Sequence, residues 1–152
     1  MKIVIHCEAQ KLRNGNQNPK NPGNVWWKKL IGLLQNEGHE IVQVGVPSDT
    51  HFVDDFRTIP IKELKLLLQE CNVWISVDSF LQHLGWRLGV KGVVIFAQTN
   101  PNIFGHKENI NLYVDEKYFM KNQFQTHEEC AYIQEAFVTP EEVVKSVYDV
   151  YK

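Results

Sequence analysis

The stretch Val73–His83, VWISVDSFLQH, joins an apolar run directly to a helical pattern, and this junction decides the fold. Val73–Val77 is short, apolar and rich in β-branched residues, which is typical of a strand buried on both faces. Asp78 and Ser79 follow as a capping pair, and leucines then recur at helical spacing at Leu81, Leu84 and Leu88. A buried strand that runs straight into an amphipathic helix is the repeating unit of α/β domains.

The same alternation continues on both sides of this junction. Further strands are predicted at Lys2–His6, Ile41–Val46, Phe56–Ile59, Gly92–Ala97 and Asn111–Val114. Further helices are predicted from Val25, from Ile61 with Pro60 in the first turn, and from Pro140 after a Thr139–Glu142 capping box. Strands that alternate with helices imply right-handed βαβ units. We therefore expect one Rossmann-like three-layer α/β domain over residues 1–152, with a mainly parallel sheet.

Two segments lack a regular pattern. Residues 8–24 are rich in Asn, Gly and Pro, which predicts a long loop, and residues 115–136 are polar and receive no assignment. At the helix that follows the loop, Trp27 lies on the apolar stripe. Trp26 lies off it, partly buried or free to stack on a base. In the terminal helix the predicted inner face ends at Tyr151.

Composition excludes several classes of protein. The 152 residues are 43% hydrophobic and carry a formal charge of −2, which excludes a disordered chain and gives no basic surplus for nucleic acid. No apolar run is long enough to span a membrane, and the first residues do not form a signal peptide. The cysteines, Cys7, Cys71 and Cys130, have no metal-site spacing, so we expect a cytoplasmic protein with no metal.

Candidate functional residues lie where the predicted strands end, because ligands of open parallel sheets bind outside the carboxyl ends of the strands. The free N–H groups of the helix at Ser79 form an anion site, and phosphate is a common occupant. His83 lies one turn further on and shares that face. The alternative is that Asp78 and Ser79 only cap the helix and that His83 is a surface residue.

A second candidate is Phe96–Pro101, FAQTNP, in which Gln98 and Thr99 follow a strand; the alternative is an ordinary turn. Lys20 in the long loop is either a phosphate counter-charge or a solvated lysine. Several motifs are absent: GxGxxG, GxxxxGK(S/T), GxSxG and DxD. Their absence disfavours a nicotinamide or flavin enzyme, a Walker-type nucleotidase, an α/β-hydrolase and a metal-dependent sugar transferase.

These residues resemble a known family. Asp78-Ser79-x-x-x-His83-Leu84, then Leu88-Gly89-Val90, Phe96, Thr99 and Pro101, is similar to the C-terminal pattern of glycosyltransferase family 9, the ADP-heptose lipopolysaccharide heptosyltransferases. That pattern is D-(S/T)-G-x-x-H-L-A-A-A-L-G, followed by a strand and F-G-P-T-x-P. The sequence departs from it at Phe80, which replaces a glycine, and at Gly85–Arg87, which replaces alanines.

The resemblance implies one half of a GT-B fold, the donor-binding domain. It places Asp78, Ser79, Phe80 and His83 at the diphosphate and sugar of a nucleotide diphosphate sugar. Gln98 and Thr99 would lie nearby, and Lys20 would match a phosphate-contacting lysine. Glycosyl transfer would then be independent of metal, with the nucleotide sugar as donor substrate and no cofactor.

Three functional hypotheses remain. The first is a glycosyltransferase-like domain that is incomplete without an acceptor-binding domain, a second chain or a homo-oligomer, because the resemblance leaves the catalytic base unidentified. The second is a stand-alone nucleotide-binding or sequestering module without turnover. The third is a relative of sugar-nucleotide epimerases, which share the fold and an Asp-Ser motif. The base, the sugar and the acceptor are not predicted.

Overall fold

A computed structural model describes all residues from Met1 to Lys152 and contains one six-stranded, fully parallel sheet. The strands are β1 (Lys2–His6), β2 (Glu40–Val44), β3 (Phe56–Arg57), β4 (Val73–Val77), β5 (Gly92–Ile95) and β6 (Ile110–Leu112). Their order is β3-β2-β1-β4-β5-β6, with Ile3 in register with both Ile41 and Val73. The predicted Rossmann-like domain is confirmed.

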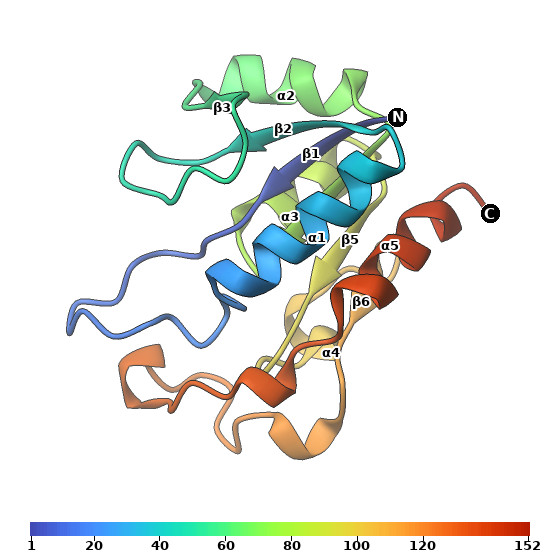
Figure 1. The fold of residues 1–152 in the computed structure, drawn as a ribbon. Helices are drawn as coiled ribbons and strands as arrows, with labels where there is room; N and C mark the ends of the chain where they lie inside the picture. Colours follow the sequence, from blue (N-terminus) through green and yellow to red (C-terminus); the bar gives the residue numbers. More distant parts are fainter.

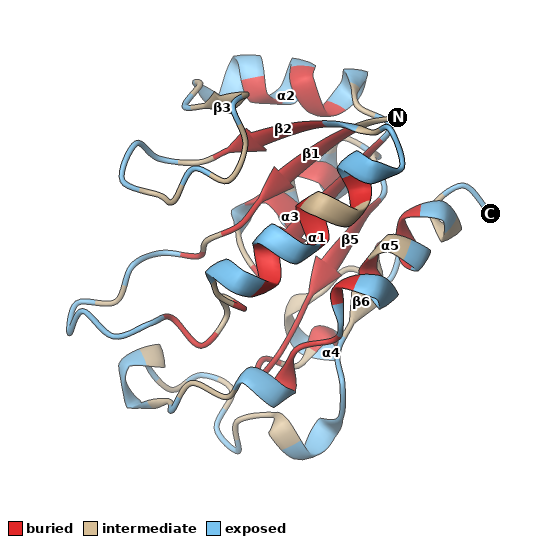
Figure 2. Ribbon diagram, viewed as in Figure 1, coloured by how far each residue is buried: buried red, intermediate tan, exposed pale blue.

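Helices cover both faces of the sheet and complete the three layers (Figure 1). On one face α1 (Asn24–Asn36) and α5 (Pro140–Asp149) lie side by side, and on the other lie α2 (Ile61–Glu70) and α3 (Phe80–Arg87). Alternate strand residues supply the two cores: Ile3 packs in the α1–α5 core and Val4 in the α2–α3 core. The four central strands are buried over most of their length, the edge strands β3 and β6 are partly exposed, and the outer faces of the helices are exposed (Figure 2).

Trp74 explains two glycines on the α2–α3 side. A Cβ atom built on Gly92 would lie 2.2 Å from the Trp74 ring, and one on Gly85 would lie 2.6 Å from it. A side chain at either glycine would therefore overlap the fully buried indole. The indole Nε1–H donates to the carbonyl of Val90 at 2.8 Å. Gly85 of the Gly85–Arg87 departure thus has a packing role.

Several element boundaries differ from the predicted ones. β2 ends at Val44, two residues early, because the chain turns where Asp49 Oδ2 accepts from the N–H of Val46. β5 ends at Ile95, and β6 runs over Ile110–Leu112 rather than to Val114. Pro60 is the N-cap of α2, in extended conformation, and lies outside its first turn. Tyr151 lies beyond α5 and is exposed, so its predicted inward position is wrong.

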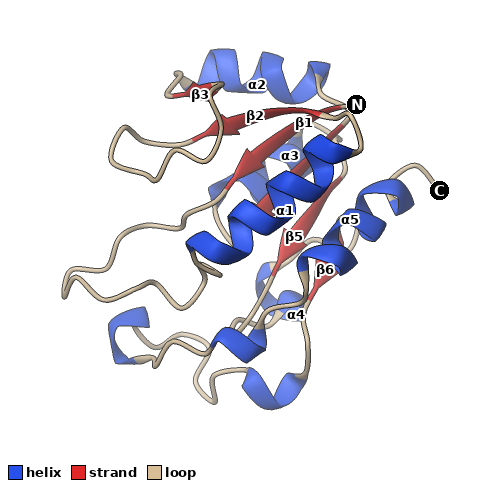
Figure 3. Ribbon diagram, viewed as in Figure 1, coloured by secondary structure: helices blue, strands red, loops and turns tan.

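Outside β6, residues 97–139 contain a short helix α4 (Pro101–Phe104) and three 3-10 turns, η1 (Glu116–Tyr118), η2 (His127–Glu129) and η3 (Gln134–Ala136). This segment and the long loop after β1 extend beyond the carboxyl ends of the strands (Figure 3). Trp26 is buried, and its Nε1–H donates to the carbonyl of Val138 at 2.8 Å. The stacking role considered for Trp26 is therefore wrong. The Thr139–Glu142 capping box is confirmed.

Candidate functional site

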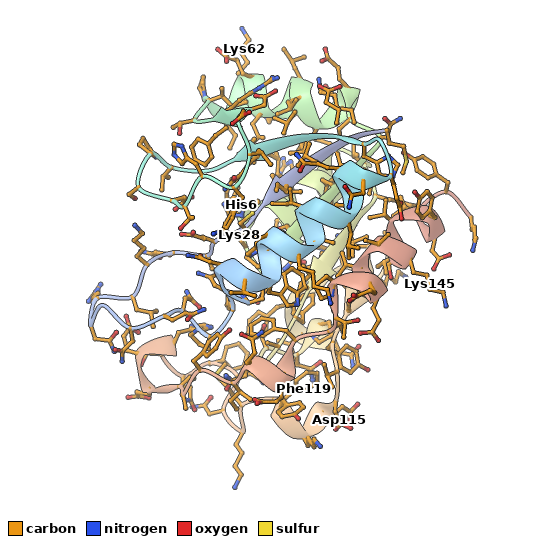
Figure 4. All side chains as sticks on the ribbon, viewed as in Figure 1. His6, Lys28, Lys62, Asp115, Phe119 and Lys145 are labelled. Atoms are coloured by element: carbon orange, nitrogen blue, oxygen red, sulfur yellow. The ribbon has the colours of Figure 1, made fainter.

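A cavity of about 1310 Å³ lies at the carboxyl ends of β1 and β4, where the strand order reverses direction. His6, labelled in Figure 4, is the last residue of β1 and lines the cavity. Asp78, Ser79 and Phe80 line it from the β4–α3 junction, and Lys20 lines it from the long loop. The cavity therefore occupies the position where open parallel sheets bind ligands.

Asp78 is a buried carboxylate with three partners drawn from different segments. Its Oδ1 accepts from the Gln82 side chain at 2.6 Å, and its Oδ2 accepts from Thr99 Oγ1 at 2.8 Å. Lys20 Nζ lies 3.2 Å from the same Oδ2. A buried charge needs such compensation, because an unpaired carboxylate would lose its hydration without replacement. The structure thus joins Lys20, Asp78 and Thr99, which the sequence analysis had singled out separately.

Ser79 occupies the N-cap position of α3, but its side chain does not cap the helix. Its hydroxyl instead lies 2.9 Å from His6 Nδ1 and 3.0 Å from Ser76 Oγ. The carboxylate of Asp78 accepts from the Gln82 side chain and does not cap the backbone either. The alternative in which Asp78 and Ser79 act only as helix caps is therefore wrong, and the first N–H groups of α3 keep no side-chain cap.

Phe80 stands on the wall of the cavity and is 49% exposed. Its ring meets the His6 ring edge to face, with centroids 5.2 Å apart and planes at 77°. Burial lowers the pKa of His6 to about 4, although the nearby Glu8 carboxylate acts in the opposite direction. His6 is therefore neutral at pH 7, and an apolar ring and a neutral imidazole form this wall.

His83 is exposed, as the alternative of a surface residue predicted, and it faces a second histidine. Its Nδ1 lies 2.8 Å from His106 Nε2, and the indole of Trp86 stacks on His106 with centroids 4.3 Å apart. Burial, followed by the proximity of His106, lowers the pKa of His83. His83 does not line the cavity with Ser79 as their shared helical face had suggested, but it is close enough to Asp78 and Lys20 for their charges to act on it.

Gln98 and Thr99 serve different neighbours. Thr99 bonds Asp78, whereas the Gln98 side chain donates to the carbonyl of Ala131 at 2.7 Å. The Gln98 carbonyl accepts from the N–H of Met120 and from the Gln123 side chain. Gln98 therefore fixes the 115–136 segment next to the site and does not line the cavity itself.

His6 and His127 also line the cavity. His6 belongs to the polar strand-end residues that the sequence marks as candidates, although it was not assigned to the phosphate site, and His127 was not predicted. Burial, and then the charge of Lys20, lower the pKa of His127, whose Nε2 is buried without a partner. The position of His6 at a strand end was the available signal. No pattern in the unassigned segment marked His127.

Three further observations concern a metal site, a membrane span and a second cavity. No group of three or more His, Cys, Asp or Glu side chains is arranged to hold a metal ion. None of the helices is both long and apolar enough to cross a bilayer. A smaller cavity of about 590 Å³ lies between the long loop and α1, with Cys7 and Trp27 on its wall.

Solved structures of similar fold define the class of this domain. It matches about half of several two-domain, GT-B heptosyltransferases. The dodecameric iron-containing heptosyltransferase TibC of enterotoxigenic E. coli, in complex with ADP-D-β-D-heptose, has a TM-score of 0.69 at 14% identity over 99% of this chain and 45% of that one. E. coli heptosyltransferase WaaC with ADP has a TM-score of 0.66 at 17% identity over 97% and 43%.

The family follows from the sequence itself. Residues 20–133 match the model of glycosyltransferase family 9 (heptosyltransferase), and the chain belongs to that family. A family 9 glycosyltransferase from Veillonella parvula gives a TM-score of 0.68 at 19% identity over 97% of this chain and 45% of that one. The chain spans less than half the length of these solved structures. No curated protein gives a significant match.

Proposed function

We propose that this chain is the donor-binding half of a heptosyltransferase-like glycosyltransferase and binds a nucleotide diphosphate sugar. The observation that carries the proposal is the Lys20–Asp78 pair at the carboxyl end of β4, next to the uncapped N–H groups of α3. The buried Asp78 accepts from one side of the Lys20 ammonium. The remaining N–H groups of that ammonium can donate to a phosphate. Ammonium and helix N–H groups together favour an anion.

In this proposal Lys20 and the first turn of α3 stabilise the diphosphate as the bond between it and the sugar breaks. Fixed donors of this kind stabilise charge as it develops on a leaving group, and no metal is required. Asp78 and Thr99 position Lys20, and Gln98 fixes the adjoining segment. Ser79 and Phe80 line the cavity that takes the donor, whereas His83 lies outside that lining. The chemical class of the donor rests on the ADP-D-β-D-heptose and ADP found with TibC and WaaC.

The acceptor and the base that activates its hydroxyl are assigned to another domain or chain. Transfer needs donor and acceptor to be held together with water excluded, which a second wall of the cleft provides. The purified chain alone should therefore bind donor but transfer no sugar until it associates with that partner or with another copy. Turnover by the monomer at an enzyme-like rate, about 1 per second, would overturn this assignment.

Calorimetric titration tests the binding step. ADP, GDP and UDP, each free and linked to a sugar, are titrated in the presence of EDTA against the chain and two lysine variants. We expect one nucleoside diphosphate to bind, and Lys20→Met to weaken it by about 1.5–3 kcal/mol, the range for a hydrogen bond to a charged group. Lys28→Met, an exposed lysine on α1, is the control and should bind normally.

Equal affinity of the wild type and Lys20→Met would remove Lys20 from the site. Binding of nucleoside diphosphates without any partner-dependent transfer would instead favour the non-catalytic nucleotide-binding module. Interconversion of the sugar on the donor would favour the epimerase relative.

A further inference from the structure

A row of three hydrogen bonds fixes the position of every proton between His6 and the backbone of β4. Ser76 Oγ lies 2.5 Å from the carbonyl oxygen of Val77, which can only accept, so the Ser76 hydroxyl is the donor. Ser76 has no second proton. The 3.0 Å contact between the two serine hydroxyls therefore requires Ser79 Oγ–H to donate to Ser76. Ser79 in turn accepts from His6 Nδ1 at 2.9 Å.

This direction determines the tautomer of His6. Nδ1 carries the proton, and Nε2 therefore holds a lone pair and acts as an acceptor. No protein group bonds to Nε2, and the His6 side chain lines the cavity. The pKa of about 4 keeps the ring neutral at pH 7, so the acceptor is present at physiological pH. The Ser79 hydroxyl donates its proton to Ser76 and therefore has none to donate to a ligand.

A neutral acceptor at this wall selects one kind of ligand group. A phosphate oxygen has no proton to give and would face the lone pair of Nε2 unfavourably, whereas a hydroxyl donates to it. The half-exposed ring of Phe80 lies against His6 and offers an apolar surface next to that acceptor. A sugar ring has both matching features, because it carries hydroxyl groups at its edge and C–H groups on its faces.

We propose that His6 and Phe80 form a subsite for the sugar ring, in which His6 Nε2 accepts from a sugar hydroxyl and the Phe80 ring packs against its C–H groups. This inference rests on the proposed function, since it names the residues that read the sugar in the same cavity. The phosphates remain with Lys20 and the first turn of α3. Phe80 thereby provides a contact that the glycine of the family pattern lacks.

Two variants separate the sugar contact from the fold. His6→Asn keeps an N–H at the place of Nδ1, so the donor to Ser79 stays, but it removes the Nε2 acceptor. Phe80→Gly restores the residue of the family pattern, and Phe80→Tyr keeps the ring as a matched control. Each protein is titrated with ADP and ADP-heptose, GDP and GDP-mannose, and UDP and UDP-glucose.

The expected readout is the ratio of the two dissociation constants, diphosphate over sugar-linked form. We expect that ratio to fall about tenfold, or ~1.4 kcal/mol, in His6→Asn and in Phe80→Gly, with the affinity for the free diphosphate unchanged. Phe80→Tyr should keep the wild-type ratio. An unchanged ratio in both variants, or an equal loss for both ligands, would overturn the subsite.

A second measurement does not depend on nucleotide binding. Long-range proton–nitrogen NMR of the wild type should show His6 protonated at Nδ1 and unprotonated at Nε2, and the opposite tautomer would overturn the inference. If no nucleoside diphosphate binds, the proposed function fails. The sugar subsite is then judged by whether free glucose, mannose or heptose shifts the Nε2 resonance. A shift supports it, and no shift rejects it.

Discussion

The variant Lys20→Met tests how much the Lys20–Asp78 ion pair contributes to the free energy of unfolding. The Asp78 side chain is 6% exposed and that of Lys20 is 22% exposed, with 3.2 Å between Nζ and Oδ2. Removing one partner of a fully buried pair costs about 3–5 kcal/mol, because the other charge remains desolvated. Lys20 is partly hydrated and Asp78 keeps its bonds from Gln82 and Thr99, so we expect a loss of about 1–3 kcal/mol.

A double-mutant cycle measures the pair itself. Lys20→Met, Asp78→Asn and the double variant are unfolded in urea at pH 7, and the coupling free energy is taken from the four free energies of unfolding. We expect a coupling of about 1 kcal/mol or more, since the double variant removes both charges and leaves neither uncompensated.

The Lys29–Glu141 pair is the control. Its N–O distance of 2.6 Å is shorter, but its side chains are 55% and 53% exposed. Solvent screens such a pair, so its cycle should give the smaller coupling. If the exposed pair couples as strongly as Lys20 and Asp78, or if the Lys20–Asp78 coupling lies within error of zero, burial does not set the strength of this contact and the reasoning is refuted.

Three further predictions concern the fold. The pKa of His6 is near 6.5 in the unfolded state and about 4 in the folded state, so the unfolded state binds more protons between these two pH values. The free energy of unfolding should therefore fall by about 3 kcal/mol as the pH falls from 6.5 to 4. His6→Asn should flatten that part of the pH–stability curve, and an unchanged slope contradicts it. Gly92→Ala places a Cβ against Trp74 and should destabilise the domain by about 1–3 kcal/mol in urea unfolding, whereas Gly32→Ala, with open space around it, should not. Thr139→Ala removes the α5 capping box and should cost about 1 kcal/mol by the same assay; an unaltered midpoint would show that α5 does not depend on it.

The layered architecture was predictable because it depends on local periodicity. Val73–Val77 and Lys2–His6 are apolar on both faces, which only a central strand of a covered sheet requires, and both strands have these bounds. The ends of β2 and β5 were placed two residues too late. Apolar residues continue past both strands, and the turn held by Asp49 after β2 is not visible in hydrophobicity.

The 115–136 segment escaped prediction for a different reason. Its 3-10 turns bury few apolar residues, and its conformation is fixed by polar contacts with distant parts of the chain. The Gln98 side chain donates to the carbonyl of Ala131, and the Gln98 carbonyl accepts from the N–H of Met120. Contacts of this kind leave no periodic signal, so His127 could not be placed at the cavity from sequence.

The site was predictable to the extent that topology determines it. Strand ends at the switch point bring His6 and Asp78 to one cavity in any doubly wound sheet, and Lys20 joins them because the chain between β1 and α1 must pass over the same edge. The tautomer of His6 was not predictable, since it depends on the direction of the hydrogen bonds among His6, Ser79 and Ser76. Ser79 is a residue type that often caps helices, yet its hydroxyl donates to Ser76, which lies on strand β4. That hydrogen bond fixes the His6 tautomer. Ser79, which the family resemblance places at the diphosphate and sugar, thereby supports the imidazole of the proposed sugar subsite.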